Sequence, residues 1–481
     1  MKKKYGFYSS LGLLVLLNAI IKPLWIFAID RQVQNVVGTE TYGIYFSLFS
    51  LSVVLSFLAD LGFTVFFNRQ LAASEMDFQK HPGSFLFLKL ILAGIYCGVL
   101  FIAGLIAGIK RWDLLLYIAL IQVFTSLLLF LRSIITARQW FRADAWLSIT
   151  DKSLMILLCG SLLWFPTVFG FMTIEKFLLF QAGCLAAAMF IALFYLVKKG
   201  TSFAMSGKWW PGGEMISRAL PFGLIVLLMS AHSRADAFLL ERMHSNGAYE
   251  AGVYAASFRL LDAANMCGYL FASFLLPYIA RRWSQREEIN SVVLQCRHLL
   301  LLFSITLVVV TIFEAPWIHR TLYHHNDVYA TQVLQLCVPA IIGYSLVQIY
   351  GTVLTATGHL GDLFMITLTA LVINIILNLL LIPPMGAKGC CIAALFSQSF
   401  YGLMAMLYTK QKTGVRLHFR SLLIYIFTAG LLSVFFIVFS NWPVAVWMLI
   451  ITAGMITAVV AVVAKLVDIQ TLLRRLPFQQ K

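Results

Sequence analysis

The stretch from Arg218 to Asp262 reads RALPFGLIVLLMSAHSRADAFLLERMHSNGAYEAGVYAASFRLLD. Its two apolar runs are separated by a short polar loop, a pattern that predicts a hairpin of two membrane-spanning helices. Charged residues nevertheless lie within or against these runs, namely Arg234, Asp236, Arg259 and Asp262. A charge at membrane depth costs free energy unless it faces protein groups or a water-filled cavity, where it often marks a pathway. We expect this hairpin to open the second half of the chain and to supply part of a binding surface.

The composition excludes an ordinary soluble protein. Of the 481 residues, 61% are hydrophobic and 12% are charged. The apolar runs are about 20 residues long, which is enough to cross a bilayer as helix. The formal net charge of +16 would favour a nucleic-acid partner in a soluble protein, but basic residues of a membrane protein gather in its cytoplasmic loops. We therefore expect an all-α integral membrane protein that binds membrane lipids and no nucleic acid.

The N-terminal sequence MKKKYGFYSSLGLLVLL has the basic start and apolar run of a signal peptide. Its apolar run continues to Ile29, however, and it contains no small-residue cleavage site. We interpret it as the first transmembrane helix.

The apolar pattern predicts about 14 transmembrane helices. The expected spans are residues 8–29, 43–66, 84–108, 114–136, 146–166, 175–197, 218–240, 250–275, 294–313, 330–356, 362–382, 389–409, 421–439 and 444–465. The expected division is an N-terminal six-helix lobe at 1–200, a cytoplasmic linker at 201–217, a C-terminal six-helix lobe at 218–412, and the last two helices with a cytoplasmic tail at 413–481.

The basic residues predict the orientation. The expected loops on the side of the two termini carry most of them, including Lys198-Lys199 and Arg281-Arg282. The positive-inside rule then places both termini in the cytoplasm. The loops of the other side are short, and the longest expected one runs from Glu314 to Asp327.

An internal repeat supports two related lobes. At one constant offset, Gly43, Tyr45, Phe49 and Leu51 match Gly252, Tyr254, Phe258 and Leu260. Both segments are expected to enter from the outer side, so the lobes would be parallel repeats related by a pseudo-two-fold axis along the membrane normal. Such repeats place a substrate site between lobes and suit alternating access.

The motifs of common enzymes are missing. Gly207-Lys208 is followed by Trp209 and is no Walker A motif, and no nucleophile elbow or metal-ligand spacing occurs. The 8 cysteines lie inside apolar runs without ligand spacing, so we interpret them as packing residues. We expect a secondary transporter and no enzyme, with no catalytic residue, no metal and no cofactor.

Intramembrane cations are the main candidates for substrate binding. Lys22 lies near the middle of the first helix beside Pro23, which is expected to kink it, and Arg259 falls near the midplane of the eighth. Arg31 and Arg234 are expected at similar heights towards the outer face. Arginine and lysine are the side chains that bind phosphate. This bias predicts an anionic substrate, a diphosphate or sugar, and disfavours a drug cation.

Four carboxylates are candidates for coupling or gating. They are Asp30, Asp236, Asp262 and Asp60. The alternative is that Asp30-Arg31, Arg234-Asp236 and Arg259-Asp262 are structural pairs or helix caps, and the residues leave this open. For the residues nearer the cytoplasmic ends we favour snorkelling or pairing between lobes over substrate contact. These are Asp60, Lys89, Arg132 and Asp151-Lys152.

Several motifs resemble those of Wzx-type polysaccharide flippases of the MOP (multidrug/oligosaccharidyl-lipid/polysaccharide) exporter superfamily. The second helix has Tyr42-Gly43, Asp60-Leu61-Gly62 and Arg69 where that family has a Tyr-Gly turn, a Leu-x-Asp-Leu-Gly and a downstream arginine, although Val37-Gly38-Thr39 replaces the usual Leu-Gly-Pro. Asp236 and Ala251-Gly252-Val253-Tyr254 match the family's seventh and eighth helices.

The segment Ala356–Ser397 resembles the family's Asn-x-x-Leu-Asn…Ile-Pro…Gly-Ala-x-Gly pattern. The matching positions are Asn374, Asn378, Pro383, Gly386 and Gly389, with Cys390-Cys391 replacing two alanines.

The resemblance implies a fold of two six-helix lobes around a central cavity (MATE-like), with two extra C-terminal helices in this chain. It implies transport of undecaprenyl-diphosphate-linked oligosaccharide, as for O-antigen or lipopolysaccharide, across a bacterial inner membrane, and coupling to Na⁺ or H⁺. Glycan polymerases or glycosyltransferases are then expected partners, and a monomer is the favoured state. The alternatives are a multidrug cation antiporter of the same fold and a lipid II flippase.

Overall fold

The computed structural model is helical throughout. It describes residues 2–64, 82–203, 213–324, 327–416, 419–439, 442, 445–464 and 466. These residues contain no strand, and among them 14 helices are long and apolar enough to cross a membrane. The predicted all-α fold with 14 spans is confirmed. Arg69, the middle of the 201–217 linker and the tail after residue 466 lie outside the described residues.

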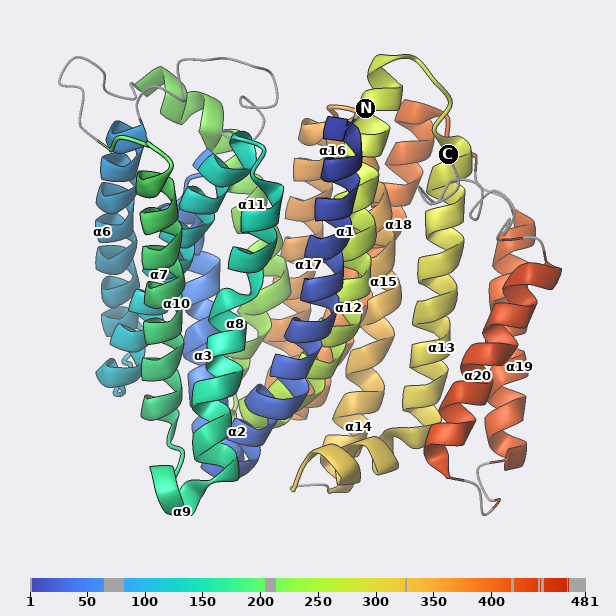
Figure 1. The fold of residues 1–481 in the computed structure, drawn as a ribbon. Coiled ribbons are helices and arrows are strands. Elements are labelled where there is room, and N and C mark those ends of the chain that lie inside the picture. Colours follow the sequence, from blue (N-terminus) through green and yellow to red (C-terminus); the bar gives the residue numbers. More distant parts are fainter. Residues whose placement is uncertain are drawn as a thin grey trace. The chain divides into compact units, whose positions relative to one another are not determined.

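The chain forms two compact units, Met1–Arg242 and Met243–Lys481. Figure 1 shows long helices in each. The helices that begin in the first unit are α1 (Lys2–Leu24), the π-helical η1 (Trp25–Asp30), α2 (Arg31–Val37), α3 (Thr39–Leu55), the 3₁₀ turn η2 (Ser56–Ala59), α6 (Pro82–Ile106), α7 (Trp112–Ala137), α8 (Phe141–Trp164), α9 (Pro166–Phe169), α10 (Ile174–Lys198) and α11 (Gly213–Met243).

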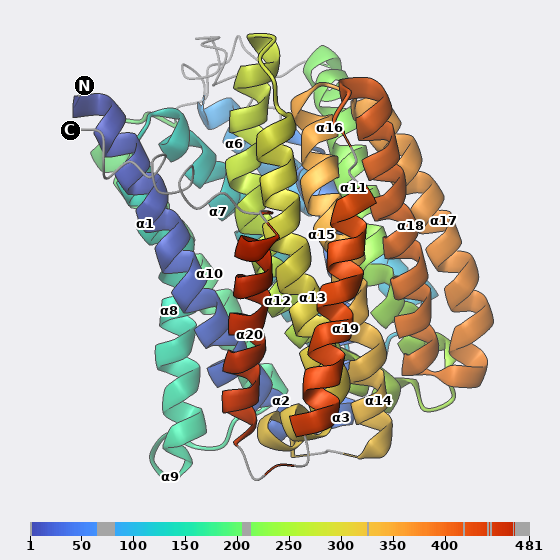
Figure 2. The same ribbon diagram turned by 90° about the vertical axis from the view of Figure 1, so that its right-hand side faces the viewer.

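The second unit continues with helices up to the C-terminal pair. They are α12 (Gly247–Ser284), α13 (Asn290–Leu322), α14 (Val328–Cys337), the 3₁₀ turn η3 (Val338–Ala340), α15 (Ile341–Leu346), the π-helical η4 (Val347–Gly351), α16 (Thr352–Ala356), α17 (Leu360–Met385), α18 (Ala387–Thr413), α19 (Phe419–Phe439) and α20 (Val446–Val463). Helices α19 and α20 pack on each other and on α13, as the two views show (Figures 1 and 2).

Helix α11 belongs to the first compact unit. The sequence repeat instead makes this helix the first of the second lobe. The expected division at 1–200, 201–217, 218–412 and 413–481 therefore stays a prediction about the functional lobes.

Two spans contain irregular helix beside a proline. Proline removes a backbone donor and crowds the preceding turn. In the first span Pro23 is followed by the π-helical turn Trp25–Asp30. In the tenth span Pro339 sits in a 3₁₀ turn, and a π-helical turn follows at Val347–Gly351. The expected disturbance near Pro23 is thus a change of hydrogen-bond register, and π-helical turns are frequent at functional sites.

The expected outer loop from Glu314 to Asp327 is wrong. Helix α13 continues through Pro316 to Leu322, and Glu314 and His319 are buried in it, with 7% and 1% of their surfaces exposed. A proline removes one backbone hydrogen bond of a helix and crowds the preceding turn. The helix continues through Pro316 because burial of residues on both sides, Glu314 and His319, keeps it packed. The connection to α14 is therefore much shorter than the polar composition indicates.

The internal repeat is visible in side-chain packing. In the first unit the rings of Tyr45 and Phe49 lie 5.8 Å apart at an interplanar angle of 45°. In the second unit Tyr254 and Phe258 lie 5.6 Å apart at 38°. The residues matched by sequence thus form the same tilted aromatic pair one helical turn apart, on α3 and on α12.

Glycines set two close backbone contacts. A Cβ at Gly62, whose φ is +78°, would lie 2.4 Å from the backbone nitrogen of Gly223 on α11. A Cβ at Gly389 would lie 2.3 Å from the carbonyl oxygen of Leu381, across the turn between α17 and α18. Small residues let membrane helices approach closely where no hydrophobic effect drives association. The Gly-Ala-x-Gly motif therefore has a packing reason.

Gly389→Ala is expected to destabilise the protein by about 1–3 kcal/mol, because the added methyl forces the α17–α18 turn apart. Gly361→Ala is the matched control on the same hairpin, since nothing lies within 4 Å of its Cβ position. Thermal unfolding of both purified variants in detergent checks this. Equal unfolding midpoints for the two would contradict the packing role of Gly389.

Candidate functional site

Lys22 is a half-buried cation on α1. The charges of Arg132, Lys152 and Asp151 are close enough to act on it. Among the described residues its ammonium makes no hydrogen bond and no ion pair within 4.0 Å. A lysine at membrane depth is costly to keep charged without a partner. Its ammonium therefore has hydrogen-bonding capacity that a ligand can use.

The neighbours of Lys22 are already paired. Arg132 on α7 donates to Asp144 on α8, with Nε 2.7 Å from Oδ1. On α8 the ammonium of Lys152 lies 3.2 Å from Oδ2 of Asp151 and 4.3 Å from the ring centroid of Trp25. The set Lys22, Arg132, Asp144, Asp151 and Lys152, here named the Lys22 cluster, therefore contains three cations and two paired carboxylates. Its excess charge is positive.

Sequence reasoning separated Arg132 and Lys152 from Lys22. We expected these two nearer the cytoplasmic ends, snorkelling or paired between lobes, but the structure places their charges beside Lys22 inside one unit. A depth counted along each helix does not show how neighbouring helices are aligned, so the sequence could not reveal this neighbourhood. A usable signal was the acidic residue twelve positions after Arg132 at the start of the next helix.

Asp60 and Lys89 form an ion pair within the first unit, in which the lysine is buried and the carboxylate half-buried. The Lys89 ammonium also donates to the carbonyl of Ala59 at 3.0 Å and to Ser126 Oγ at 2.7 Å. The backbone N–H of Thr64 donates to Asp60 at 3.1 Å. All three hydrogens of the Lys89 ammonium are thus used, and only 2% of its surface is exposed. The expectation of pairing between lobes is wrong for these two, and the gating role of Asp60 stays a prediction.

The four charges expected towards the outer face, Asp30, Arg31, Arg234 and Asp236, all lie in the first unit. Asp30 is fully buried and accepts a hydrogen bond from the Tyr42 hydroxyl at 2.8 Å. Arg31 is half-buried, and its Nη2 donates to Gln32 Oε1 at 3.2 Å. On α11 Arg234 is half-buried and Asp236 is buried, with 2% exposed. The structure thus joins Asp30 to the Tyr42-Gly43 turn of the resemblance, and the roles of these four charges stay predictions.

The second unit buries its candidates on α12. Arg259 is 7% exposed, Asp262 is half-buried three residues later, and Asn265 is 5% exposed one turn further. Residues three apart share a helix face, so the predicted common face of Arg259 and Asp262 is present.

The asparagines of the family-like motif form a buried network in the second unit. Nδ2 of Asn378 donates to Oδ1 of Asn374 at 3.1 Å, and Nδ2 of Asn374 donates to Ser397 Oγ on α18 at 3.2 Å. All three residues are fully buried. The network explains the spacing of the two asparagines, because residues four apart meet on one helix face.

Glu250 is a structural residue that sequence reasoning missed. Its Oε2 accepts from the Tyr329 hydroxyl at 2.5 Å and from the backbone N–H of Ala387 at 2.8 Å. A Cβ at Gly386, whose φ is +56°, would lie 2.4 Å from the same oxygen. This carboxylate joins α12, α14 and the start of α18. The partly positive N-terminus of α18 stabilises its negative charge. The signal in the sequence was an acid directly before a matched repeat motif.

The described residues contain no group of three His, Cys, Asp or Glu side chains that could hold a metal ion. The coupling ion therefore stays a prediction.

Fourteen membrane-length helices in the described part of the chain, with charges buried in both units, define a multi-pass membrane protein. The chain belongs to the polysaccharide biosynthesis protein family, whose model matches residues 8–283. A second family model, MatE, matches residues 221–380. The predicted membership of the MOP superfamily is confirmed.

Solved structures share the fold over nearly the whole chain. Lipid II flippase MurJ in an inward closed conformation has a TM-score of 0.73 at 14% identity, covering 94% of this chain and 97% of its own. An inward-facing MATE multidrug resistance transporter has a TM-score of 0.64 at 13% identity, covering 83% and 97%. A MOP superfamily transporter from Pyrococcus furiosus has a TM-score of 0.62 at 12% identity, covering 84% and 95%. These identities establish the fold and no substrate. No curated protein matches the chain.

Removing one partner of the Asp60–Lys89 pair is expected to cost about 3 kcal/mol of unfolding free energy, because it leaves a charge buried without its partner. Lys89→Met and Asp60→Asn should each lower stability, and the double variant should recover most of the loss, as a double-mutant cycle of detergent-solubilised protein can measure. Additive losses in the double variant would show that the two charges do not stabilise each other.

Proposed function

We propose that the protein is a Wzx-type flippase that moves undecaprenyl-diphosphate-linked oligosaccharide from the cytoplasmic to the outer leaflet of a bacterial inner membrane. It acts by alternating access driven by a Na⁺ or H⁺ gradient, with both termini cytoplasmic. The observation that carries this proposal is Lys22, a half-buried ammonium without a hydrogen bond or ion pair among the described residues. Membership of the polysaccharide biosynthesis protein family supports it.

The chemistry of the Lys22 cluster fits a diphosphate. Phosphate oxygens accept charge-assisted hydrogen bonds, which are about twice as strong as neutral ones. Lys22 supplies an available donor, and the nearby Arg132 and Lys152 raise the local positive potential while their carboxylates hold them in place. The diphosphate is the part of the substrate that most resists the membrane interior, so neutralising it there lowers the barrier to crossing. The prenyl chain needs no protein groups, because lipid solvates it.

The cluster argues against a multidrug cation antiporter. An organic cation requires a carboxylate that can pair with it. In the Lys22 cluster both carboxylates are engaged by Arg132 and Lys152, and the excess positive charge repels a cation. The substrate of a lipid II flippase contains the same diphosphate and differs in its sugar. Only identification of the transported lipid distinguishes that alternative.

Deletion of the gene is expected to trap undecaprenyl-linked oligosaccharide on the cytoplasmic face, because the flippase is the step that exposes it outside. Leaflet-resolved analysis of radiolabelled lipid-linked sugar measures this. Accumulation of lipid II in its place would favour the lipid II flippase. Unchanged glycans together with new sensitivity to cationic drugs would favour the antiporter.

Lys22→Gln is expected to lower export at least tenfold at unchanged protein level, a loss of about 1.4 kcal/mol or more in transition-state binding. Lys22→Arg should keep most export, because it retains the charge. Lys176→Gln is the control, since this lysine is exposed and donates to the carbonyl of Phe171. The readout is surface glycan together with an immunoblot of the membrane fraction. Full export by Lys22→Gln would remove the basis for a phosphate role of this residue.

A further inference from the structure

Arg297 on α13 is a second buried cation, and the proposed function does not use it. It lies about 10 Å along the helix from Asn290, at 1.5 Å per residue. Only 4% of its surface is exposed. Its neighbours along α13, Cys296, Leu300 and Leu301, belong to a buried apolar cluster of the second unit. A guanidinium in such surroundings loses its hydration, a penalty of several kcal/mol that partners must offset.

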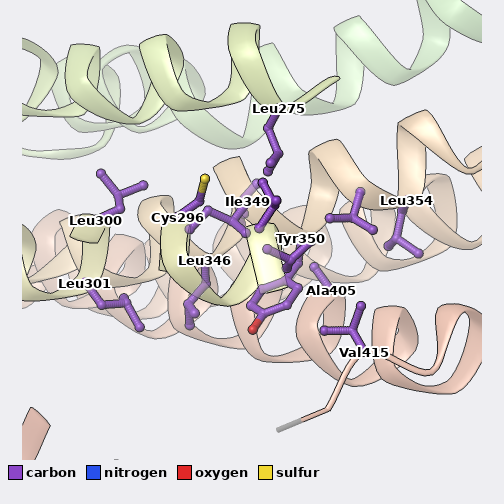
Figure 3. Close-up of a cluster of buried hydrophobic side chains, with 14 of the residues drawn as sticks. Leu275, Cys296, Leu300, Leu301, Leu346, Ile349, Tyr350, Leu354, Ala405 and Val415 are labelled. Atoms are coloured by element: carbon purple, nitrogen blue, oxygen red, sulfur yellow. The ribbon is translucent and has the colours of Figure 1, made fainter. Parts of the chain in front are cut away.

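Two tyrosine hydroxyls are the neighbours of Arg297. Nη1 donates to the hydroxyl of Tyr350 at 3.4 Å, a long and weak hydrogen bond. The hydroxyl of Tyr425 on α19 is an electrostatic neighbour of the guanidinium and lies 2.6 Å from Nδ1 of His298. Tyr350 belongs to the π-helical η4, and Figure 3 shows its ring among the apolar side chains with the hydroxyl turned away from Leu275.

The other edge of the guanidinium is unsatisfied. Nε and Nη2 of Arg297 are buried and have no hydrogen-bond partner among the described residues. No carboxylate of the described residues lies within 4.0 Å of Arg297. Nε and Nη2 form the side-on edge that holds phosphate or carboxylate through two parallel hydrogen bonds. The unsatisfied donors are therefore those suited to a planar or tetrahedral oxyanion.

The first unit shows how a buried cation is neutralised. Lys89 on α6 is paired with Asp60. At the offset of the repeat, Lys89 corresponds to His298, the neighbour of Arg297 in sequence, and Asp60 corresponds to Tyr269, whose side chain is exposed and carries no charge. Among the described residues, Arg297 therefore has no carboxylate beside it as Lys89 has.

We propose that Arg297, with the hydroxyls of Tyr350 and Tyr425, is a binding site for a phosphate anion, supplied by an anionic lipid headgroup or by free phosphate. The Nε–Nη2 edge of Arg297 binds two oxygens of the anion. The Tyr350 hydroxyl accepts from Nη1 and has its own proton to donate, and the Tyr425 hydroxyl has its proton to donate when Nδ1 of His298 is the donor between them. The bound anion supplies the negative charge and joins α13 and η4 to α19. This site does not depend on the identity of the transported lipid.

Direct binding to the purified full-length protein tests the site. Native mass spectrometry measures binding of dioleoylphosphatidylglycerol, with phosphate-free dioleoylglycerol as control. Equilibrium dialysis with radiolabelled inorganic phosphate, at ionic strength matched with sodium chloride, measures the free anion. We expect Arg297→Gln to weaken binding of the probe at least about tenfold. Arg416→Gln, which removes an exposed arginine just before α19, should leave binding unchanged.

The two probes separate the sources of the phosphate. Binding of the lipid assigns the site to a headgroup, and binding of inorganic phosphate assigns it to a free anion. Tyr425→Phe keeps the ring and removes one hydroxyl, so it should weaken binding about threefold or more even if Arg297→Gln does not fold. The proposal is overturned if the unaltered protein binds neither probe, or if Arg297→Gln or Tyr425→Phe binds as tightly as the unaltered protein.

Discussion

The need to satisfy polar groups inside an apolar environment governs this structure. A helix satisfies its own backbone in the membrane, so the cost falls on charged and polar side chains. The chain meets it with local networks, such as Lys89 with Asp60, Asn374 with Asn378, and Glu250 with the start of α18. The asparagine network joins α17 to the next helix, α18, and the Glu250 network joins helices further apart in sequence, α12, α14 and α18. Buried polar groups therefore help to specify which helices pack together.

Lys22 and Arg297 depart from this rule, and they carry the functional inferences. Among the described residues, Lys22 has charged neighbours and no direct partner, and the side-on edge of Arg297 has no hydrogen-bond partner. Such groups persist where a ligand supplies the missing interaction. The matched Tyr45–Phe49 and Tyr254–Phe258 pairs show that the two units share one packing plan. Lys89 has a carboxylate partner in the first unit, whereas no described carboxylate lies within 4.0 Å of Arg297 in the second.

The helices could be predicted from sequence because an apolar run of membrane length has one stable solution, a helix. The partners of charges could not. Asp60 and Lys89 are 29 residues apart, and the sequence does not show that their side chains meet. The neighbours of Lys22 depend on how α1, α7 and α8 are aligned. Glu314, Pro316 and His319 were interpreted as a loop because they are polar or break helices, yet packing keeps them in α13. Arg297 was overlooked because its span is otherwise apolar, although a lone arginine in such a span is itself a signal.

Reconstitution of the purified protein into liposomes is the direct test of whether it moves the lipid-linked oligosaccharide between leaflets. Undecaprenyl-diphosphate-linked oligosaccharide is placed in both leaflets, and an impermeant glycosidase removes sugar from the outer one. We expect the protein to expose the inner pool at least about tenfold faster than protein-free liposomes do, and Lys22→Gln to abolish most of this gain. A protein that leaves the inner pool protected but carries a cationic dye across the same membrane would contradict the account.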